Sequence, residues 1–533
     1  MSTATTAAAP YHVESFTPDE EAILRRHVTN LTLPVFALTG LPEVTCAALF
    51  ARYSRSSKSL RRLLLDEFIT GDDAAAPASQ AVGAGRASDL FSRVLSDYGD
   101  DSVAQLAGVH IACEQVSQPL AKAIEWGRLM AYLEQSTRYI PYTDKRDGEY
   151  RYHRDPAVMA SPLRDVYRGA MDGLFDTYVG LLTPLQEHLD RTLPPEPDEQ
   201  ARRRAIRALA LDQLRGLLPA GTVSNIGVFG SPQAFEQMVL RLRAHPLPEA
   251  RAYAELIADE LRRVIPDFVT RLDRAERGGV WVDYLRETAE QLAAEARALA
   301  PAPSMPEPAR VSLVEWDRDA EDQILAAALY PHALCSEREL LDAVRALPAV
   351  DRERVFAAAV GERGNRRHKP GRGFEHAAYT FEVVSDYGAF RDLQRHRMLT
   401  IQWQRLTPDL GYTVPADVDA AGLGDRWRAA VERAEDAHGQ LLVEYPEQAA
   451  YTITLGHRMR YLMRFNAREA MHMIELRTSP QAHPSYRRIC QEMHRLIADE
   501  AKHPLIAGSL RFVGSADVHL PRYASEAKRG DRV

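Results

Sequence analysis

The chain has 533 residues and a mass of 59.6 kDa, a length that predicts more than one domain and excludes a single small module. Hydrophobic residues make up 45% and charged residues 26%, which excludes a largely disordered or fibrous chain. With 66 basic and 74 acidic residues the formal net charge is −8, which argues against a protein that coats nucleic acid through bulk charge.

The predicted elements follow a disordered tail over residues 1–15 and include a small-residue loop over 71–88. Apolar residues that recur every three or four positions predict helices over 44–68, 202–218, 248–265, 281–299, 426–444 and 486–501. Shorter β-branched and aromatic runs predict strands at 379–384 and 411–414. The fold class that these elements predict is α+β, rich in helix.

The two halves of the chain resemble each other. Residues 101–142 and 373–415 each run from an apolar segment through an Arg-bearing turn into a polar loop, and Arg128 aligns with Arg397 at a lag of 269 residues. Residues 299–311 hold four prolines and cannot continue a helix, so they predict a linker. We therefore expect two tandem domains, over 16–298 and 312–533.

The four cysteines have no paired spacing, so neither a disulfide framework nor a metal site is predicted. The N-terminal residues lack the pattern of a secretory signal, and no apolar run reaches the ~18 residues that span a bilayer. These features predict a soluble, cytoplasmic protein without a membrane or nucleic-acid partner.

Two polar segments are candidates for ligand binding. Arg395, His396 and Arg397 form the densest basic cluster, which at a turn suits an anionic group such as a pyrophosphate or a reduced flavin, or is a solvated basic turn. Residues 134–139 (EQSTRY) place Ser and Thr hydroxyls beside an Arg, which suits a phosphate, or form a plain loop that enters a strand.

These two segments resemble the flavin-dependent thymidylate synthases, whose signature reads R-H-R, two residues, S, one residue, N-E, one residue, S, one residue, R-Y. The second half keeps the R-H-R at 395–397 but has lost the loop. The first half has Trp126, Gly127 and Arg128 at the R-H-R but keeps the loop residues Glu134, Ser136, Arg138 and Tyr139.

A second element of that family is an Arg six residues before N-x-R, followed by a Leu-Arg pair. The second half matches it with Arg460, Asn466, Arg468 and Leu476-Arg477. Helical spacing alone would make Arg460, Arg464 and Arg468 one solvated stripe. His376 after Glu375 is similar to a Glu-His pair that the family places near its flavin, or is a satisfied core histidine.

The resemblance implies a fold of two synthase-like domains, each a sheet flanked by long helices, and one composite site per chain. It implies that Ser136, Arg138, Tyr139, Arg460 and Arg468 bind the nucleotide, that Glu134 orders its sugar or base, and that Arg477 polarises the uracil. It further implies that Arg395, His396, Arg397, His376 and Asn466 hold FAD.

The activity that the resemblance implies is methylation of dUMP, or a related uridine nucleotide, at C5. NADPH and methylenetetrahydrofolate would be co-substrates, and two double-domain chains would form a homodimer. A nucleotide- or flavin-binding protein without turnover, with a sensor or scaffold role, is the alternative. A purely structural helical protein is a third reading.

Overall fold

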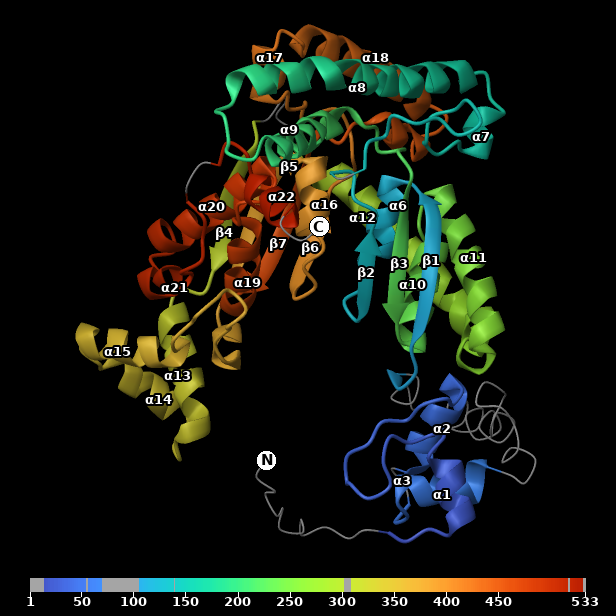
Figure 1. Cartoon of the computed structure of the whole chain (residues 1–533), viewed down its shortest axis with the longest axis vertical. Helices are drawn as coiled ribbons and strands as arrows, with labels where there is room; N and C mark the ends of the chain where they lie inside the picture. The colour runs from blue at the N-terminus through green and yellow to red at the C-terminus, as the bar shows by residue number, and fades with distance from the viewer. Residues whose placement is uncertain are drawn as a thin grey trace. The chain divides into compact units, whose positions relative to one another are not determined.

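The computed structural model describes residues 14–53, 56–69, 105–138, 140–301, 308–515 and 518–530, which form a mixed α and β protein (Figure 1). The predicted α+β class is confirmed. The predicted loop over 71–88, and the predicted tail up to residue 13, lie outside the described residues. None of the described helices is long and apolar enough to cross a membrane.

The chain forms two compact units. Unit 1 comprises Met1–Ala112, Leu129–Leu133 and Gly227–Leu299, and unit 2 comprises Cys113–Arg128, Glu134–Ile226 and Ala300–Val533. One boundary falls at the start of the proline-rich segment. Because compactness does not report ancestry, the division into two duplicated domains at 299–311 stays a prediction.

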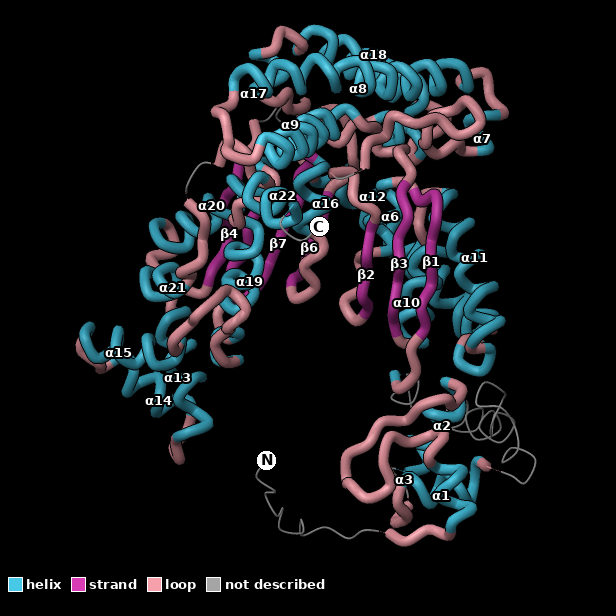
Figure 2. Tube along the Cα trace, in the orientation of Figure 1, coloured by secondary structure: helices cyan, strands magenta, loops and turns pink. Residues whose placement is uncertain are grey.

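Unit 1 holds a small helical core and most of a three-stranded sheet. Leu24, Leu49 and Leu63 are fully buried where three N-terminal helices meet. The strands lie in the order β1-β3-β2 (Figure 2). A boundary between the two units falls within the residue range of each strand. The elements are α1 (Pro18–Leu24), α2 (Glu43–Tyr53), α3 (Leu60–Leu63), β1 (Val109–Val116), β2 (Met130–Glu134), β3 (Ser224–Gly230), α10 (Pro232–Arg243), α11 (Pro248–Val264) and α12 (Val280–Leu299).

Unit 2 is built on an antiparallel four-stranded sheet with strand order β4-β5-β7-β6. The strands are β4 (Arg310–Trp316), β5 (Ala378–Asp386), β6 (Leu399–Trp403) and β7 (Arg458–Asn466). Along β7, Tyr461 and Met463 are buried while Leu462 and Arg464 are exposed, because successive side chains point to opposite faces. The helix α20 (Pro484–Asp499) contacts β4 and β5.

Helices of unit 2 surround this sheet, and α8 lies beside α18 (Figure 1). The remaining helices are α6 (Gln118–Ile124), α7 (Pro156–Met159), α8 (Arg164–Thr192), α9 (Glu199–Leu214), α13 (Ala320–Leu329), α14 (Glu337–Arg345), α15 (Ala349–Val360), α16 (Tyr387–Leu393), α17 (Ala416–Ala420), α18 (Gly424–Leu442), α19 (Ala467–Arg477), α21 (Pro504–Ser509) and α22 (Tyr523–Gly530). Short 3-10 or π turns cover Leu64–Phe68, Arg215–Leu217, Pro266–Phe268, Thr270–Asp273, Ala275–Gly279, Tyr330–His332, Arg372–Glu375 and Gln448–Thr452.

Three sequence predictions are corrected. Residues 411–414 form one isolated bridge rather than a strand, because Gly411 has a φ of 69° and Pro415 follows. The helix predicted over 44–68 is broken, because the Ser59 side chain caps a new helix by accepting a hydrogen bond from Arg62 N. Arg460 and Arg464 lie on β7 rather than on a helix.

Candidate functional site

Eleven charged side chains of unit 2 form a connected group, here called the charge cluster. The group brings together residues from β2, α9 and α16 and from the ends of α6 and α19. Its members are Lys122, Glu125, Glu134, Arg138, Asp212, Arg215, Arg391, Asp392, Arg395, Arg477 and Arg522.

Glu134 links the two candidate segments of the sequence. It is the last residue of β2, is buried, and accepts hydrogen bonds from Arg391, from Arg395 at 2.7 Å and from Lys122 at 3.3 Å. Burial raises the pKa of this carboxyl, and the surrounding positive charges of Arg391, Lys122 and Arg395 outweigh that effect and hold it well below its ordinary value. Glu134 is therefore an anion that fixes the position of Arg395.

Arg138 is held in place by Asp212. Its Nε and Nη2 donate to the two carboxylate oxygens of Asp212 at 2.9 and 2.7 Å, and its Nη1 donates to Tyr486 Oη at 2.7 Å. Arg522 donates to the same carboxylate at 2.9 and 3.1 Å. Burial raises the pKa of Asp212, but the hydrogen bonds and charge of Arg138, together with His483 and Arg522, outweigh that effect and lower the pKa. Asp212 thus joins two guanidinium groups that lie 384 residues apart.

Asp392 lies between Arg215 and Arg477. Its carboxylate is 3.4 Å from Arg215 Nη1 and 3.7 Å from Arg477 Nη1, and its carbonyl accepts a hydrogen bond from Arg477 Nη2. Burial raises the pKa of Asp392, and Arg215 and Arg477 oppose that effect so strongly that the pKa lies far below its usual value. Arg477 at the end of α19 and Arg215 in the turn after α9 therefore both lie against the Asp392 carboxylate of α16.

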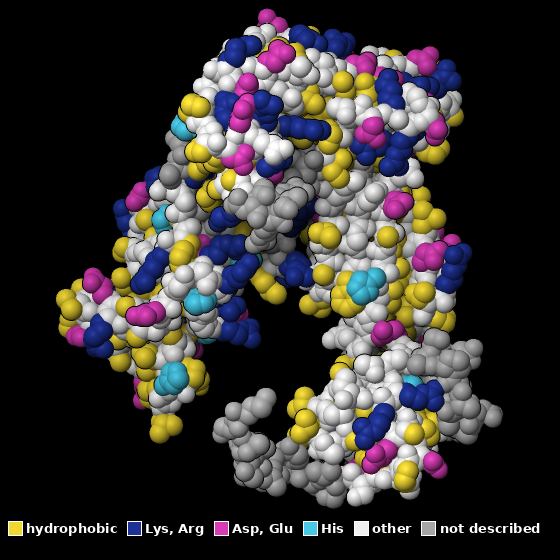
Figure 3. Space-filling view, in the orientation of Figure 1, with side chains coloured by type: hydrophobic (Ala, Val, Ile, Leu, Met, Phe, Trp, Pro, Cys, Tyr) yellow, Lys and Arg dark blue, Asp and Glu magenta, His cyan; other side chains and the backbone are white. Residues whose placement is uncertain are grey.

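The charge cluster has more cations than anions. It holds seven Lys or Arg side chains and four carboxylates. Its buried guanidinium nitrogens include Nη2 of Arg215 and Nε of Arg391, for which the described residues offer no hydrogen-bond partner. Figure 3 shows basic side chains gathered over α19 and β6. Because buried charges are normally paired, this excess favours an anionic ligand.

The predicted flavin residues differ in exposure. Arg395 and Arg397 are exposed, whereas His396 is only 6% exposed. The Nδ1 atom of His396 is 2.8 Å from Glu469 Oε1, and its Nε2 accepts a hydrogen bond from Arg477 Nε at 3.0 Å. In the R-H-R segment, the side chains of both arginines are therefore exposed, whereas the histidine between them is buried and hydrogen-bonded.

Other predicted residues have structural partners. Ser136 Oγ accepts a hydrogen bond from Arg138 N at 3.2 Å, and Asn466 caps α19 by accepting from Glu469 N at 2.9 Å. Arg468 donates to Pro370 O at 3.0 Å, and Arg460 Nη1 lies 3.6 Å from Glu382 Oε1 in the sheet. Tyr139 lies outside the described residues.

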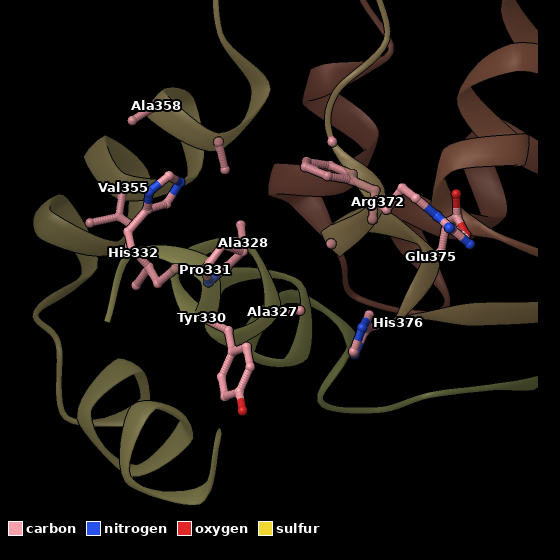
Figure 4. Close-up of a pocket in the computed structure, with 15 residues that line it drawn as sticks. Ala327, Ala328, Tyr330, Pro331, His332, Val355, Ala358, Arg372, Glu375 and His376 are labelled. Atoms are coloured by element: carbon pink, nitrogen blue, oxygen red, sulfur yellow. Dashed lines mark hydrogen bonds and ion pairs between the residues drawn. The ribbon is translucent and has the colours of Figure 1, made fainter. Parts of the chain in front are cut away.

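His376 lies apart from the charge cluster, on a cavity of about 760 Å³ between α13, α15 and the turn Arg372–Glu375 (Figure 4). Alanine and valine side chains line it together with Tyr330 and His332. Arg372 lies beside Glu375 and donates to it at 3.2 Å. His376 is exposed, so the interpretation of a satisfied core histidine is wrong.

Seven members of the charge cluster were not predicted from the sequence: Lys122, Glu125, Asp212, Arg215, Arg391, Asp392 and Arg522. Arg391 had a signal, because it precedes Arg395 by four residues, the spacing of one helical turn, although α16 ends at Leu393. Asp212 and Arg522 had none, because their contacts join segments 310 residues apart.

The comparisons with known proteins identify the family. The model of the family described as thymidylate synthase complementing protein, Thy1, matches residues 41–267 and 313–503. The chain belongs to this family, which confirms the resemblance to flavin-dependent thymidylate synthases.

Relatives of similar length exist in two bacteria and an archaeon. The chain is 37% identical over 522 residues to a UPF0159 protein of Chlamydia muridarum, covering 96% of this chain and 98% of that protein. It is 36% identical over 524 residues to a UPF0159 protein of Chlamydia pneumoniae, covering 97% and 98%. It is 29% identical over 510 residues to a UPF0159 protein of Thermoplasma acidophilum, covering 90% and 98%.

One similar solved structure is the UMP/dUMP methylase PolB from Streptomyces cacaoi, bound with 5-Br dUMP. It is 19% identical, with a TM-score of 0.31, and the match covers 40% of this chain and 98% of that chain.

Proposed function

We propose that the charge cluster binds a pyrimidine nucleotide together with FAD, and that the chain methylates dUMP, or a related uridine nucleotide, at C5. The observation that carries this proposal is the excess of buried positive charge where residues 134–138 meet residues 391–397 and Arg477. Family membership supplies the reaction class.

The described contacts support different roles for the arginines. Arg138 is saturated by Asp212 and Tyr486, so its role is to hold the loop that carries Ser136. Arg215 is a buried cation of the cluster, and it would bind the nucleotide phosphate with Ser136. Arg460 and Arg468 would extend this basic surface, and Tyr139 would contribute to nucleotide binding. Arg477 would donate to the uracil oxygen on which negative charge develops.

The residues present also fit the anionic diphosphate of FAD, because Arg395 and Arg397 are exposed beside the cluster. Bound reduced flavin would supply the two-electron reduction that a methyl group requires. The overall reaction would be dUMP, methylenetetrahydrofolate, NADPH and one proton giving dTMP, tetrahydrofolate and NADP⁺. His396 would keep the two flanking arginines on the protein surface, and Asn466 would line the flavin site.

One observation favours the alternative of binding without turnover. Asp212 and Asp392 are acidic groups that already pair with Arg138, Arg215 and Arg477. A nucleotide phosphate must compete with these carboxylates for the same guanidinium groups. Such a site would suit a nucleotide sensor or scaffold.

Turnover separates the two functions. We expect dTMP to form when the full chain is given FAD, dUMP, NADPH and methylenetetrahydrofolate, and we expect Arg477→Ala to lower kcat by about 100-fold or more because it removes a charged donor. Arg464→Ala is the matched control, since Arg464 is exposed and pairs with Glu315 on the sheet. Retained dUMP binding without dTMP would establish the alternative, and absence of both binding and turnover would contradict the proposal.

A further inference from the structure

Glu469, His396 and Arg477 form a continuous hydrogen-bonded line at the edge of the charge cluster. Glu469 Oε1 lies 2.8 Å from His396 Nδ1, and Arg477 Nε donates to His396 Nε2 at 3.0 Å. Glu469 and His396 are less than 8% exposed. The family resemblance gave no role to Glu469, so its contact with a predicted flavin residue requires an explanation.

The protonation of Arg477 fixes the direction of both hydrogen bonds. An arginine is always protonated and its Nε–H can only donate, so Nε2 of His396 must be the acceptor. Burial, with the positive charges of Arg477 and Lys369, lowers the pKa of His396 well below its ordinary value, so the ring is neutral. Its single proton is therefore on Nδ1 and is donated to Glu469.

The position of Glu469 in α19 suits it to accept this proton. It is the third residue of the helix, where the exposed N–H groups favour a carboxylate, and its own N–H is bonded to Asn466. Burial raises the pKa of Glu469 above its ordinary value, and the facing groups His472, Lys369, Arg468 and Arg477 oppose only part of that rise.

We propose that Glu469 is a positioning residue for Arg477. By accepting the Nδ1 proton, Glu469 keeps His396 in the one tautomer whose Nε2 can hold Arg477 Nε, while Asp392 O accepts from Arg477 Nη2. The guanidinium is then fixed in two places, with Nη1 directed toward Asp392. This inference rests on the proposed function only in assigning Arg477 to the nucleotide.

The surrounding charges argue against a metal ion at the same place. His396, Glu469 and His472 each offer one ligand atom, and these atoms lie within 4.8 Å of one another. Both ring nitrogens of His396 are already engaged, however, and Lys369, Arg468 and Arg477 would repel a cation.

The tautomer of His396 is measured by long-range ¹⁵N–¹H correlation NMR on the full chain labelled with ¹⁵N-histidine. We expect His396 to be protonated on Nδ1. His457 is an internal reference for which we expect the opposite tautomer, protonated on Nε2. Its Nδ1 accepts a hydrogen bond from Thr454 N, and its Nε2 lies 3.0 Å from Glu435 Oε1. A wild-type His396 protonated on Nε2 would overturn the proposal, and so would a zinc-dependent shift of its resonances at stoichiometric Zn²⁺.

Binding variants test the consequence for Arg477. We expect Glu469→Leu to lower dUMP affinity by about tenfold or more, because it leaves the Nδ1 proton without a buried acceptor. Glu469→Gln keeps an acceptor and should stay within about threefold of wild type. Glu435→Leu removes the partner of His457 instead and should leave the affinity unchanged.

The outcomes separate this proposal from the proposed function. A wild-type chain that binds no dUMP contradicts the function, while the tautomer of His396 still tests the line of hydrogen bonds. A wild-type chain that binds dUMP as tightly as Glu469→Leu contradicts the positioning role alone. If Glu469→Leu does not fold, the tautomer of His396 in the wild type and the dUMP affinity of Glu469→Gln still test the positioning role. A loss of dUMP affinity in Glu469→Gln as large as the loss in Arg477→Ala would show that the charge of Glu469 matters rather than its hydrogen-bond acceptor, and would contradict the proposal.

Discussion

At the scale of single residues, buried carboxylates keep the basic side chains of the charge cluster in position. Asp212, Asp392 and Glu134 each join two or more basic side chains from different elements. The sequence predicted Glu134 but neither aspartate, because an isolated Asp in a helix has no local pattern that marks it as buried. A family resemblance therefore predicts residues that bind a ligand more readily than the partner residues that keep them in position.

Asp212 has a direct consequence for stability. We expect Asp212→Asn to lower the free energy of unfolding by about 3 kcal/mol, because Arg138 and Arg522 would remain buried without their carboxylate. Urea denaturation of the full chain measures this change. Asp499→Asn is the matched control, since Asp499 forms only an exposed ion pair with Arg495 and should change stability by less than about 0.5 kcal/mol. Equal effects of the two variants would refute the central role of Asp212.

At the scale of elements, helical periodicity predicted most of the long helices. The predicted ranges 248–265 and 281–299 agree with α11 and α12 within one residue at each end. The arginines at 460 and 464 were ambiguous, because residues four apart share a face in a helix and in a strand alike. Pairing of β7 with β5 decides between the two, and that partner lies about 80 residues away along the chain.

Asn466 shows how an element explains a predicted cofactor residue. Its side chain caps α19, so we expect Asn466→Ala to lower the stability of the FAD-free protein by about 1 kcal/mol, while Asn466→Ser retains the cap. Thermal unfolding monitored by circular dichroism measures the difference. If Asn466 served FAD alone, both variants would unfold at the wild-type temperature in the absence of FAD.

At the scale of the whole molecule, the main result is that the two candidate segments of one chain contact each other. Glu134 contacts Arg395 across 261 residues of sequence, and Arg138 contacts Tyr486 across 348. Local patterns do not encode such contacts, and only the complementary loss of motif residues in the two halves pointed to them. The homodimer of double-domain chains stays a prediction, which sedimentation of the full chain tests.

The central claim is that the charge cluster and the R-H-R segment form one site for a flavin and a pyrimidine nucleotide. The most direct measurement is the visible absorption spectrum of the full chain after reconstitution with FAD and removal of the excess, before and after addition of dUMP. We expect the chain to retain a flavin spectrum that dUMP perturbs. A chain that retains no flavin, or a flavin spectrum that dUMP leaves unchanged, would contradict it.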